Sequence, residues 1–307
     1  MVIVVVCPGQ GSQTPGFLAP WLAESAYAER LSALSDAAGL DLAHFGTEAD
    51  ADTIRDTAVA QPLIVAAGIL TLGSLLADGR AARIGGIAGH SVGEITAAAG
   101  SGVLSETDAI RFVAERGRAM ADAAALEPTG MSAVIGADEA ALLPRLTELG
   151  LEPANFNGGG QIVVAGALDA LEALKTEPPA GSRVIPLQVA GAFHTRYMRP
   201  AVDRLAEVAA GLAPADPTLP LWTNRDGSAV TSGAAFLELL VGQVSSPVRW
   251  DRCMESFQAA GVTGIIELAP AGALVGLAKR ALKGVPTVAV KTPEDLSAAI
   301  ELIEQHA

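Results

Sequence analysis

The 307-residue chain has only two cysteines, Cys7 and Cys253, which lie far apart in apolar or amphipathic segments. Two such residues cannot make a disulfide framework or a cysteine-rich metal cluster. We therefore expect both thiols to be reduced residues of the core, and we expect no metal site.

Basic side chains are also scarce, because 20 Lys and Arg stand against 34 Asp and Glu and give a formal net charge of −14. Binding to nucleic acid needs a net or local excess of positive charge. The composition therefore argues against a nucleic-acid partner. An acidic partner would need a local basic patch, for which Lys279, Arg280 and Lys283 are candidates, although a cluster this small more often only solvates the surface.

Long hydrophobic runs are missing. The longest nearly apolar stretch, 63–77, is interrupted by Gly68, Thr71, Gly73 and Ser74 and is shorter than the ~20 residues that a membrane span needs. It predicts a buried helix with Pro62 near its first turn. Residues 1–7 have no basic region and are too short for a signal peptide, so they predict a first strand. We expect a cytoplasmic protein that binds no membrane.

Half of the residues are apolar, and the length suits one large α/β domain or a domain with an insertion. From residue 1 to about 124, short β-rich segments alternate with longer helical ones, which indicates a mostly parallel sheet. The expected elements are strands at 2–6 and 83–88 and helices at 25–38, 62–77, after Ser91 and after Ser105. The pattern resumes with strands near 219–223, 264–268 and 285–290, and a last helix with Thr292 as its N-cap.

Between about 129 and 189 the order of elements changes. The expected order is a strand at 131–137, a helix at 138–149, strands at 151–157 and 161–165, a helix at 169–177 and a strand at 183–189. This βαββαβ order predicts a ferredoxin-like unit. We therefore divide the chain into a core, residues 1–126 and 196–307, and an inserted subdomain, residues 127–195.

Residues 89–93, Gly-His-Ser-Val-Gly, form a G-x-S-x-G element between an apolar run and a helix-permissive segment. This is the pattern of a nucleophile elbow, in which small residues flank a serine where the backbones crowd. The turn exposes Oγ of Ser91 and directs the amide of Val92 at a developing oxyanion. A glycine-rich turn can also contain a serine by chance. The expected strand and helix on either side favour acyl-transfer chemistry.

A serine nucleophile needs a base, which is usually histidine. Of the four histidines, His44 lies in an acidic segment, His306 lies next to the C-terminus, and His90 lies inside the elbow, where its side chain would point away from Oγ. A single histidine often has only a structural role. Because the chemistry requires a base, we predict that His194 pairs with Ser91.

The helix expected after Ser105 has an apolar stripe that contains one arginine. The apolar residues at helical spacing are Ala109, Phe112, Val113 and Met120. Arg116 lies in the middle of this stripe, whereas Arg111 and Arg118 project from the opposite face. A buried arginine needs a partner, because an unpaired buried charge costs several kcal/mol. That partner is either an internal carboxylate or the carboxylate of a substrate.

The loop after the first strand, residues 8–13, has the sequence Pro-Gly-Gln-Gly-Ser-Gln. It lacks the lysine of a P-loop, and its glycine spacing breaks the dinucleotide-binding pattern. We expect it instead to supply a second oxyanion donor, either from the backbone or from the side chain of Gln10.

Taken together, the motifs resemble the malonyl-CoA:acyl-carrier-protein transacylase family over essentially the whole chain. The matching segments are 8–13, Gln61-Pro62, 89–94, Arg116-Gly117, 155–166, 192–194 and 243–247. The fold of this family is an α/β-hydrolase-like core with a ferredoxin-like insertion, in agreement with the order of elements. The resemblance implies malonyl-CoA and an acyl carrier protein as partners. It implies no metal or redox cofactor, and we expect a monomer.

The resemblance also implies roles for individual residues. Ser91 would be acylated with His194 as its general base, and the main-chain carbonyl of Gln243 would orient His194. The backbone amides of Gln10 and Val92 would form the oxyanion hole.

Three further residues would contact the acyl group. Arg116 would bind the free carboxylate of malonyl, and Asn157 matches an asparagine on the side of the active site. Phe193 before the histidine and Val92 after the serine match related enzymes that select malonyl rather than methylmalonyl.

Other functions remain open at this point. A free-standing acyltransferase of polyketide synthesis would carry the same motifs. A serine thioesterase or esterase is disfavoured by Arg116 in the apolar stripe and by the lack of an evident acid between Ser91 and His194. A non-catalytic carrier- or CoA-binding protein would not need both residues.

Overall fold

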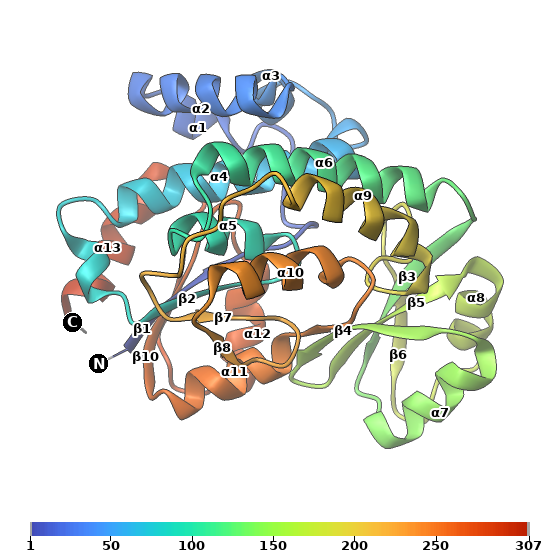
Figure 1. Ribbon diagram of the computed structural model, residues 1–307. Coiled ribbons are helices and arrows are strands. Elements are labelled where there is room, and N and C mark those ends of the chain that lie inside the picture. Colours follow the sequence, from blue (N-terminus) through green and yellow to red (C-terminus); the bar gives the residue numbers. More distant parts are fainter. Residues whose placement is uncertain (1, 306–307) are drawn as a thin grey trace.

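The computed structural model describes residues 2–305, which form two sheets with helices packed around them (Figure 1). The larger sheet has the strand order β11-β10-β1-β2-β7-β8. Its strands are β1 (Val2–Cys7), β2 (Gly86–Gly89), β7 (Leu221–Trp222), β8 (Ala229–Val230), β10 (Val262–Glu267) and β11 (Thr287–Ala289). All neighbours are parallel except β7 and β8, which confirms the mostly parallel sheet.

Helices cover both faces of the larger sheet. The helices of this part are α1 (Ala19–Leu22), α2 (Ser25–Ala38), α3 (Leu42–Thr47), α4 (Thr57–Leu75), α5 (Gly93–Gly100), α6 (Glu106–Ala124), α9 (Arg199–Ala209), α10 (Gly233–Gln243), α11 (Trp250–Ala259), α12 (Ala273–Ala281) and α13 (Leu296–Gln305). Alternate residues of β1 enter separate clusters: Ile3 and Val5 pack with α4 and α6, and Val4 and Val6 with α11 and α12. A parallel strand buried on both faces has this nearly continuous apolar sequence.

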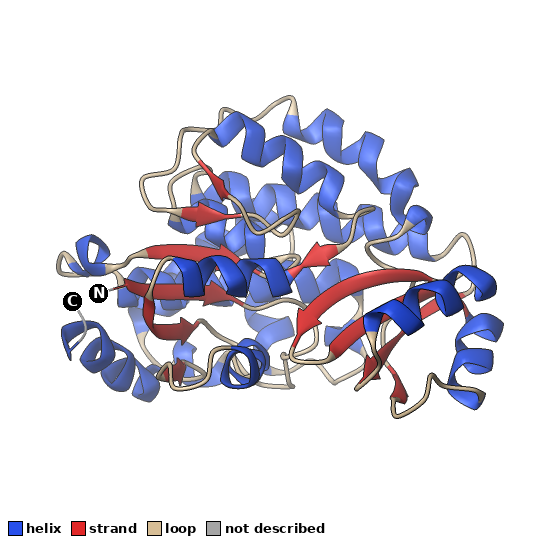
Figure 2. Cartoon of the chain, turned by 90° about the horizontal axis from the view of Figure 1, so that it is seen from below, coloured by secondary structure: helices blue, strands red, loops and turns tan. Residues whose placement is uncertain are grey.

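The smaller sheet lies beside the larger one (Figure 2) and has the order β6-β3-β5-β4-β9. Its strands are β3 (Thr129–Ile135), β4 (Glu152–Gly158), β5 (Gln161–Ala167), β6 (Arg183–Pro186) and β9 (Val248–Arg249). The pairs are antiparallel except β4 with β9. Leucines of α7 (Glu139–Leu149) and α8 (Leu168–Thr176) pack with Phe156 and Val164 in a separate core. Since β9 follows residue 195 in the chain, the sheet includes one strand from outside the segment 127–195.

The apolar helix α4 corrects the expected start at Pro62. It begins at Thr57 with Asp56 as N-cap, whose carboxylate accepts a hydrogen bond from the amide of Ala58 (2.8 Å), so Pro62 lies inside the helix. Asp56 is a stronger start signal than a proline six residues later. At 19 residues, α4 is long and apolar enough to cross a membrane, but 78% of its apolar window is buried in the fold. It is the central core helix of this part.

The ends of some other strands and helices differ from those expected from the sequence, each because of the local structure. The strand expected at 83–88 is the shorter β2, because residues Arg80–Arg83 form a 3-10 turn. The strand expected at 183–189 ends at Pro186, beyond which the amide of Leu187 donates one further bond to the carbonyl of Met131 (2.9 Å). Thr292 caps the last helical segment as expected, but that segment opens with the 3-10 turn Pro293–Asp295 before α13. Further 3-10 turns lie at Thr53–Arg55 and Arg196–Met198.

Candidate active site

Ser91 lies on the tight turn between β2 and α5, with a left-handed backbone (φ 54°). A Cβ on Gly89 would lie 1.9 Å from the carbonyl carbon of Gly93, and a Cβ on Gly93 would lie 2.1 Å from the carbonyl oxygen of Cys7. Only glycine fits at either position, because both contacts are with backbone atoms. The structure therefore explains the spacing of the motif by close approach of β1, β2 and α5.

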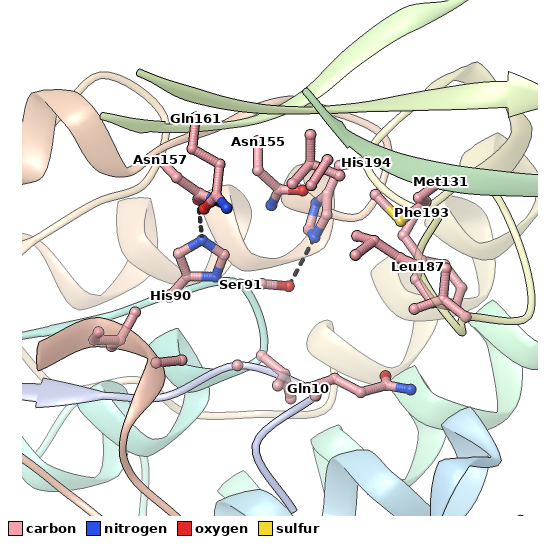
Figure 3. A pocket seen from close by; sticks show the side chains of 18 of the residues that line it. Gln10, His90, Ser91, Met131, Asn155, Asn157, Gln161, Leu187, Phe193 and His194 are labelled. Atoms are coloured by element: carbon pink, nitrogen blue, oxygen red, sulfur yellow. Dashed lines mark hydrogen bonds between the residues drawn. The ribbon is translucent and has the colours of Figure 1, made fainter. Parts of the chain in front are cut away.

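His194 meets Ser91 as predicted. Its Nε2 lies 2.7 Å from Ser91 Oγ (Figure 3). Its Nδ1 lies 2.9 Å from the main-chain oxygen of Gln243. Burial lowers the pKa of His194 to about 3, and the charge of Arg116 contributes to this shift. The imidazole is therefore neutral near pH 7. A neutral ring that donates from Nδ1 to a carbonyl presents Nε2 as an acceptor for the serine proton.

The other histidines lie elsewhere. His90 turns away from Ser91 Oγ, as expected, and its Nε2 lies 2.9 Å from Oδ1 of Asn157 (Figure 3). Asn157 in turn donates to Gln161 (3.1 Å), so this pair joins the elbow to the smaller sheet. His44 is exposed on α3. His306 lies outside the described residues.

Arg116 is buried beneath Ser91, with 1% of its surface exposed. Its Nη1 donates to Gln61 Oε1 (2.6 Å), its Nη2 donates to Gln243 Oε1 (2.7 Å), and Nη2 lies 3.5 Å from Ser91 Oγ. Burial lowers the pKa of Arg116 to about 10, which still leaves the guanidinium charged. Within residues 2–305 its partners are neutral amides and the hydroxyl, and it forms no ion pair. The internal salt bridge is therefore not found.

Three residues that sequence reasoning did not assign support the elbow. Asn224 accepts from the amide of Ser91 (2.7 Å) and donates its side-chain amide to the carbonyl of Gly89 (2.5 Å). Gln61 is a partner of Arg116, and Glu94 accepts from the side chain of Gln243. Gln61 and Glu94 lie in segments of the family resemblance, whereas Asn224 follows an expected strand without any motif to mark it.

Glu94 is fully buried near these residues. Burial raises the pKa of its carboxyl to about 7. Hydrogen bonds from Asn224 and Gln243 and the charge of Arg116 lower this pKa, but their effect is smaller than that of burial. The carboxyl and the guanidinium make no direct contact, because the side chain of Gln243 joins them.

The loop after β1 lies against the elbow. A Cβ on Gly9 would lie 2.9 Å from the carbonyl oxygen of His90. The side chain of Gln10 donates to the carbonyl of Arg55 (3.3 Å) and lies away from Ser91 (Figure 3), so only its backbone is suited to oxyanion binding. Between residues 2 and 305, neither the amide of Gln10 nor that of Val92 donates to a backbone carbonyl. Both are thus available for an oxyanion.

Ser91 and His194 line a cavity of about 410 Å³ between the two sheets. Its lining includes Asn157, Phe193, Val92, residues 9–11 of the loop after β1, and apolar side chains from β3 and α12. Arg116 lies below this lining, next to Ser91 Oγ. Of the candidate basic patch, Arg280 lines the cavity, and Lys279 and Lys283 are exposed nearby on and after α12.

Among the described residues, His, Cys, Asp and Glu side chains do not gather in groups of three or more that could hold a metal ion. Both cysteines are buried and free, as expected.

Comparison with known proteins agrees with this geometry. Residues 4–296 match the acyl transferase domain family. The malonyl CoA-acyl carrier protein transacylase of Mycobacterium tuberculosis is 54% identical over 299 residues, which cover 96% of this chain and 98% of the relative. The Escherichia coli protein of the same name is 34% identical over 304 residues, with 97% and 98% coverage.

Solved structures show the same relationship. The crystal structure of the M. tuberculosis transacylase has a TM-score of 0.95 at 53% identity and covers 98% of this chain and 100% of its own. A malonyl-transacylase in complex with a type II polyketide synthase acyl-carrier protein has a TM-score of 0.91 at 32% identity, with 98% and 99% coverage. The chain belongs to the malonyl CoA-acyl carrier protein transacylase family of acyl transferases.

Proposed function

We propose that this acyltransferase moves a malonyl group from malonyl-CoA to the phosphopantetheine thiol of an acyl carrier protein, through a malonyl ester on Ser91, and so supplies fatty acid synthesis. The observation that carries this proposal is the buried guanidinium of Arg116 beside Ser91 Oγ, which forms no ion pair with any residue between 2 and 305. A malonyl group on Ser91 has a free carboxylate a few atoms from the ester. Arginine binds such a group with two parallel hydrogen bonds.

In the first half-reaction, Nε2 of His194 takes the Ser91 proton while Oγ attacks the thioester carbonyl. The carbonyl oxygen becomes an oxyanion, for which the amides of Gln10 and Val92 are the donors. The C–S bond then breaks, and His194 returns the proton to the leaving CoA thiolate. The second half-reaction is the reverse sequence, with the carrier thiol as nucleophile. In place of the carboxylate of a hydrolase triad, the carbonyl of Gln243 fixes the ring of His194.

The remaining residues of the site concern selectivity and shape. Phe193 closes the cavity next to His194 and leaves little room for a branched acyl group, which favours malonyl over methylmalonyl. Val92 presents a small side chain next to the nucleophile. Asn157 holds His90 and so steadies the elbow against the smaller sheet.

We infer that the larger part is an α/β-hydrolase-like core, residues 1–126 and 196–307, and that residues 127–195 are a ferredoxin-like subdomain. The antiparallel order β6-β3-β5-β4 and the helices α7 and α8 support the latter. We infer a cytoplasmic monomer that uses no cofactor beyond the CoA thioester of its substrate. The burial of α4 within the fold supports the cytoplasmic assignment.

A polyketide-type role is the second candidate, because one related structure is of a malonyl-transacylase with a polyketide synthase carrier protein. The two roles share the chemistry and differ in the carrier.

The test is to incubate the enzyme with malonyl-CoA and a carrier protein and to measure carrier mass and free malonate. We expect malonylation of carrier that bears phosphopantetheine and none of the carrier without it. Rates with a fatty acid and a polyketide carrier separate the two roles. Release of malonate in place of carrier malonylation would contradict both and indicate a thioesterase.

A further inference from the structure

Glu94, three residues after the nucleophile, has its carboxylate enclosed behind the elbow, with 1% of the residue exposed. Its Oε1 accepts from the backbone amide of Asn224 (2.6 Å), and its Oε2 accepts from the side-chain Nε2 of Gln243. Both oxygens are therefore acceptors, as in the ionised form of the carboxyl, which has no proton to donate. Because burial raises the pKa of this carboxyl to about 7, the ionised form predominates above neutral pH. None of the chemical steps derived above uses this group.

Gln243 uses both ends of its side-chain amide. Its Oε1 accepts from Nη2 of Arg116 (2.7 Å), and its Nε2 donates to the carbonyl of Ser91 (3.0 Å) and to Glu94. A guanidinium only donates hydrogen bonds, and a carboxylate only accepts them. Of the two orientations of the amide, one satisfies both neighbours. The reverse orientation would set NH₂ against the guanidinium and oxygen against the carboxylate.

We propose that Glu94 is a positioning residue for malonyl selectivity, because it fixes the side-chain amide of Gln243 so that the amide oxygen holds Arg116 beside Ser91. This inference rests on the proposed function, in which Arg116 binds the malonyl carboxylate. The buried negative charge also favours the charged guanidinium. Glu94 thus acts on the acyl group through two intervening side chains and does not touch the substrate.

A purely structural role would have a different signature. Glu94 also accepts from the backbone amide of Asn224, whose side chain holds the amide of Ser91 and the carbonyl of Gly89. If support of the elbow were its whole role, its loss would slow every acylation of Ser91 alike. If it acts through Arg116, its loss weakens the reaction of an acyl group with a free carboxylate and spares the acetyl group, which has none.

The variant Glu94→Gln separates these roles with almost no change of shape. The backbone amide of Asn224 still donates to the side-chain oxygen of the new glutamine, so the new NH₂ group faces the NH₂ group of Gln243. Two donors cannot bond each other, and the side chain of Gln243 is therefore expected to turn away from Arg116. We expect kcat/KM for Ser91 acylation by malonyl-CoA, divided by that for acetyl-CoA, to fall at least about tenfold, with the acetyl reaction within about threefold of wild type. Glu238→Gln is the matched control, because Glu238 is an exposed glutamate on α10. It lines, together with Glu94 and Gln243, a second cavity that is separate from the one at Ser91. This variant should leave the ratio unchanged.

The same ratio in an Arg116→Ala background completes a double-mutant cycle. There, Glu94→Gln should have no further effect, because the group that it positions is gone. If the Arg116→Ala variant alone keeps the preference for malonyl-CoA, the proposed role of Arg116 is refuted, and the role of Glu94 is refuted with it. If Arg116→Ala removes the preference but Glu94→Gln does not, or if Glu94→Gln slows both acyl groups equally, the role of Glu94 is refuted on its own.

Circular dichroism and a melting curve establish that each variant folds. If Glu94→Gln does not fold, Glu94→Asp replaces it, since it keeps the carboxylate but is one methylene too short to reach Gln243. The same fall in the ratio of kcat/KM for malonyl-CoA to that for acetyl-CoA supports the proposal, and an unchanged ratio overturns it.

Discussion

The guanidinium of Arg116 lies 3.5 Å from the hydroxyl oxygen of Ser91, and amide oxygens hold it there without an ion pair within residues 2–305. A buried charge without a counter-charge is costly and is kept where it has a use. We propose that this use is to bind an anionic acyl group attached to Ser91. Such a role would explain how a serine–histidine pair can prefer a malonyl ester.

The first prediction concerns Arg116→Ala. We expect the preference for malonyl-CoA over acetyl-CoA to fall roughly 10- to 100-fold, the effect of losing charge-assisted hydrogen bonds. The rate of Ser91 acylation with each thioester measures it. Arg118→Ala is the control, because Arg118 pairs with Glu115 at the surface of the same helix. Equal ratios in wild type and Arg116→Ala would rule out this role of Arg116.

The second prediction concerns pH. In the proposed mechanism His194 acts as a base when neutral. Its pKa is lowered to about 3, so wild-type acylation should not lose the base near the ordinary histidine value of 6.5. Arg116→Ala removes one cause of the lowered pKa, so the acidic limb for acetyl-CoA should move to higher pH. Burial is the larger cause and remains, so the limb should stay below pH 6.5. A limb that does not move, or moves to lower pH, would contradict the influence of Arg116.

The third prediction concerns the elbow. In Gly93→Ala the new methyl group would overlap the carbonyl of Cys7, so we expect destabilisation of about 3 kcal/mol or more, or no soluble protein. In Gly276→Ala, within α12, the methyl group has open space, and the change should be neutral or slightly stabilising. Urea unfolding of both variants measures the difference. Similar stabilities would show that the close contact at Gly93 is not required.

The fourth prediction concerns acyl size. Phe193→Ser, alone or with Val92→Gln, should open the cavity beside His194 and admit methylmalonyl-CoA, with a loss of stability from the shortened buried side chain. Competition between malonyl-CoA and methylmalonyl-CoA measures the preference. An unaltered preference in a folded variant would remove Phe193 from the selectivity determinants.

Sequence reasoning found much of this site because its chemistry is local. The elbow, the buried position of Arg116 and the need for a base are readable from spacing and periodicity, and the helix at 25–38 has the predicted bounds. The pairing of His194 with Gln243 came from family resemblance, because the two residues are 49 positions apart and meet only through the fold.

Other features depend on tertiary contacts and carry no pattern. Asn224 is an ordinary polar residue after a strand in the sequence, yet its side chain holds the amide of Ser91 and the carbonyl of Gly89. Strand β9 has two residues and is too short to show periodicity. The start of α4 differs from the expected one, because Asp56 caps the helix before Thr57 and Pro62 lies inside it.

The most direct test of the whole account is the intact mass of the protein after brief exposure to malonyl-CoA and, separately, to acetyl-CoA, with Ser91→Ala as control. The account predicts a malonyl adduct in the wild type that forms in preference to an acetyl adduct, is absent from Ser91→Ala, and disappears when carrier protein with its phosphopantetheine thiol is added. Steady release of CoA without any adduct, or an adduct that persists in Ser91→Ala, would contradict it.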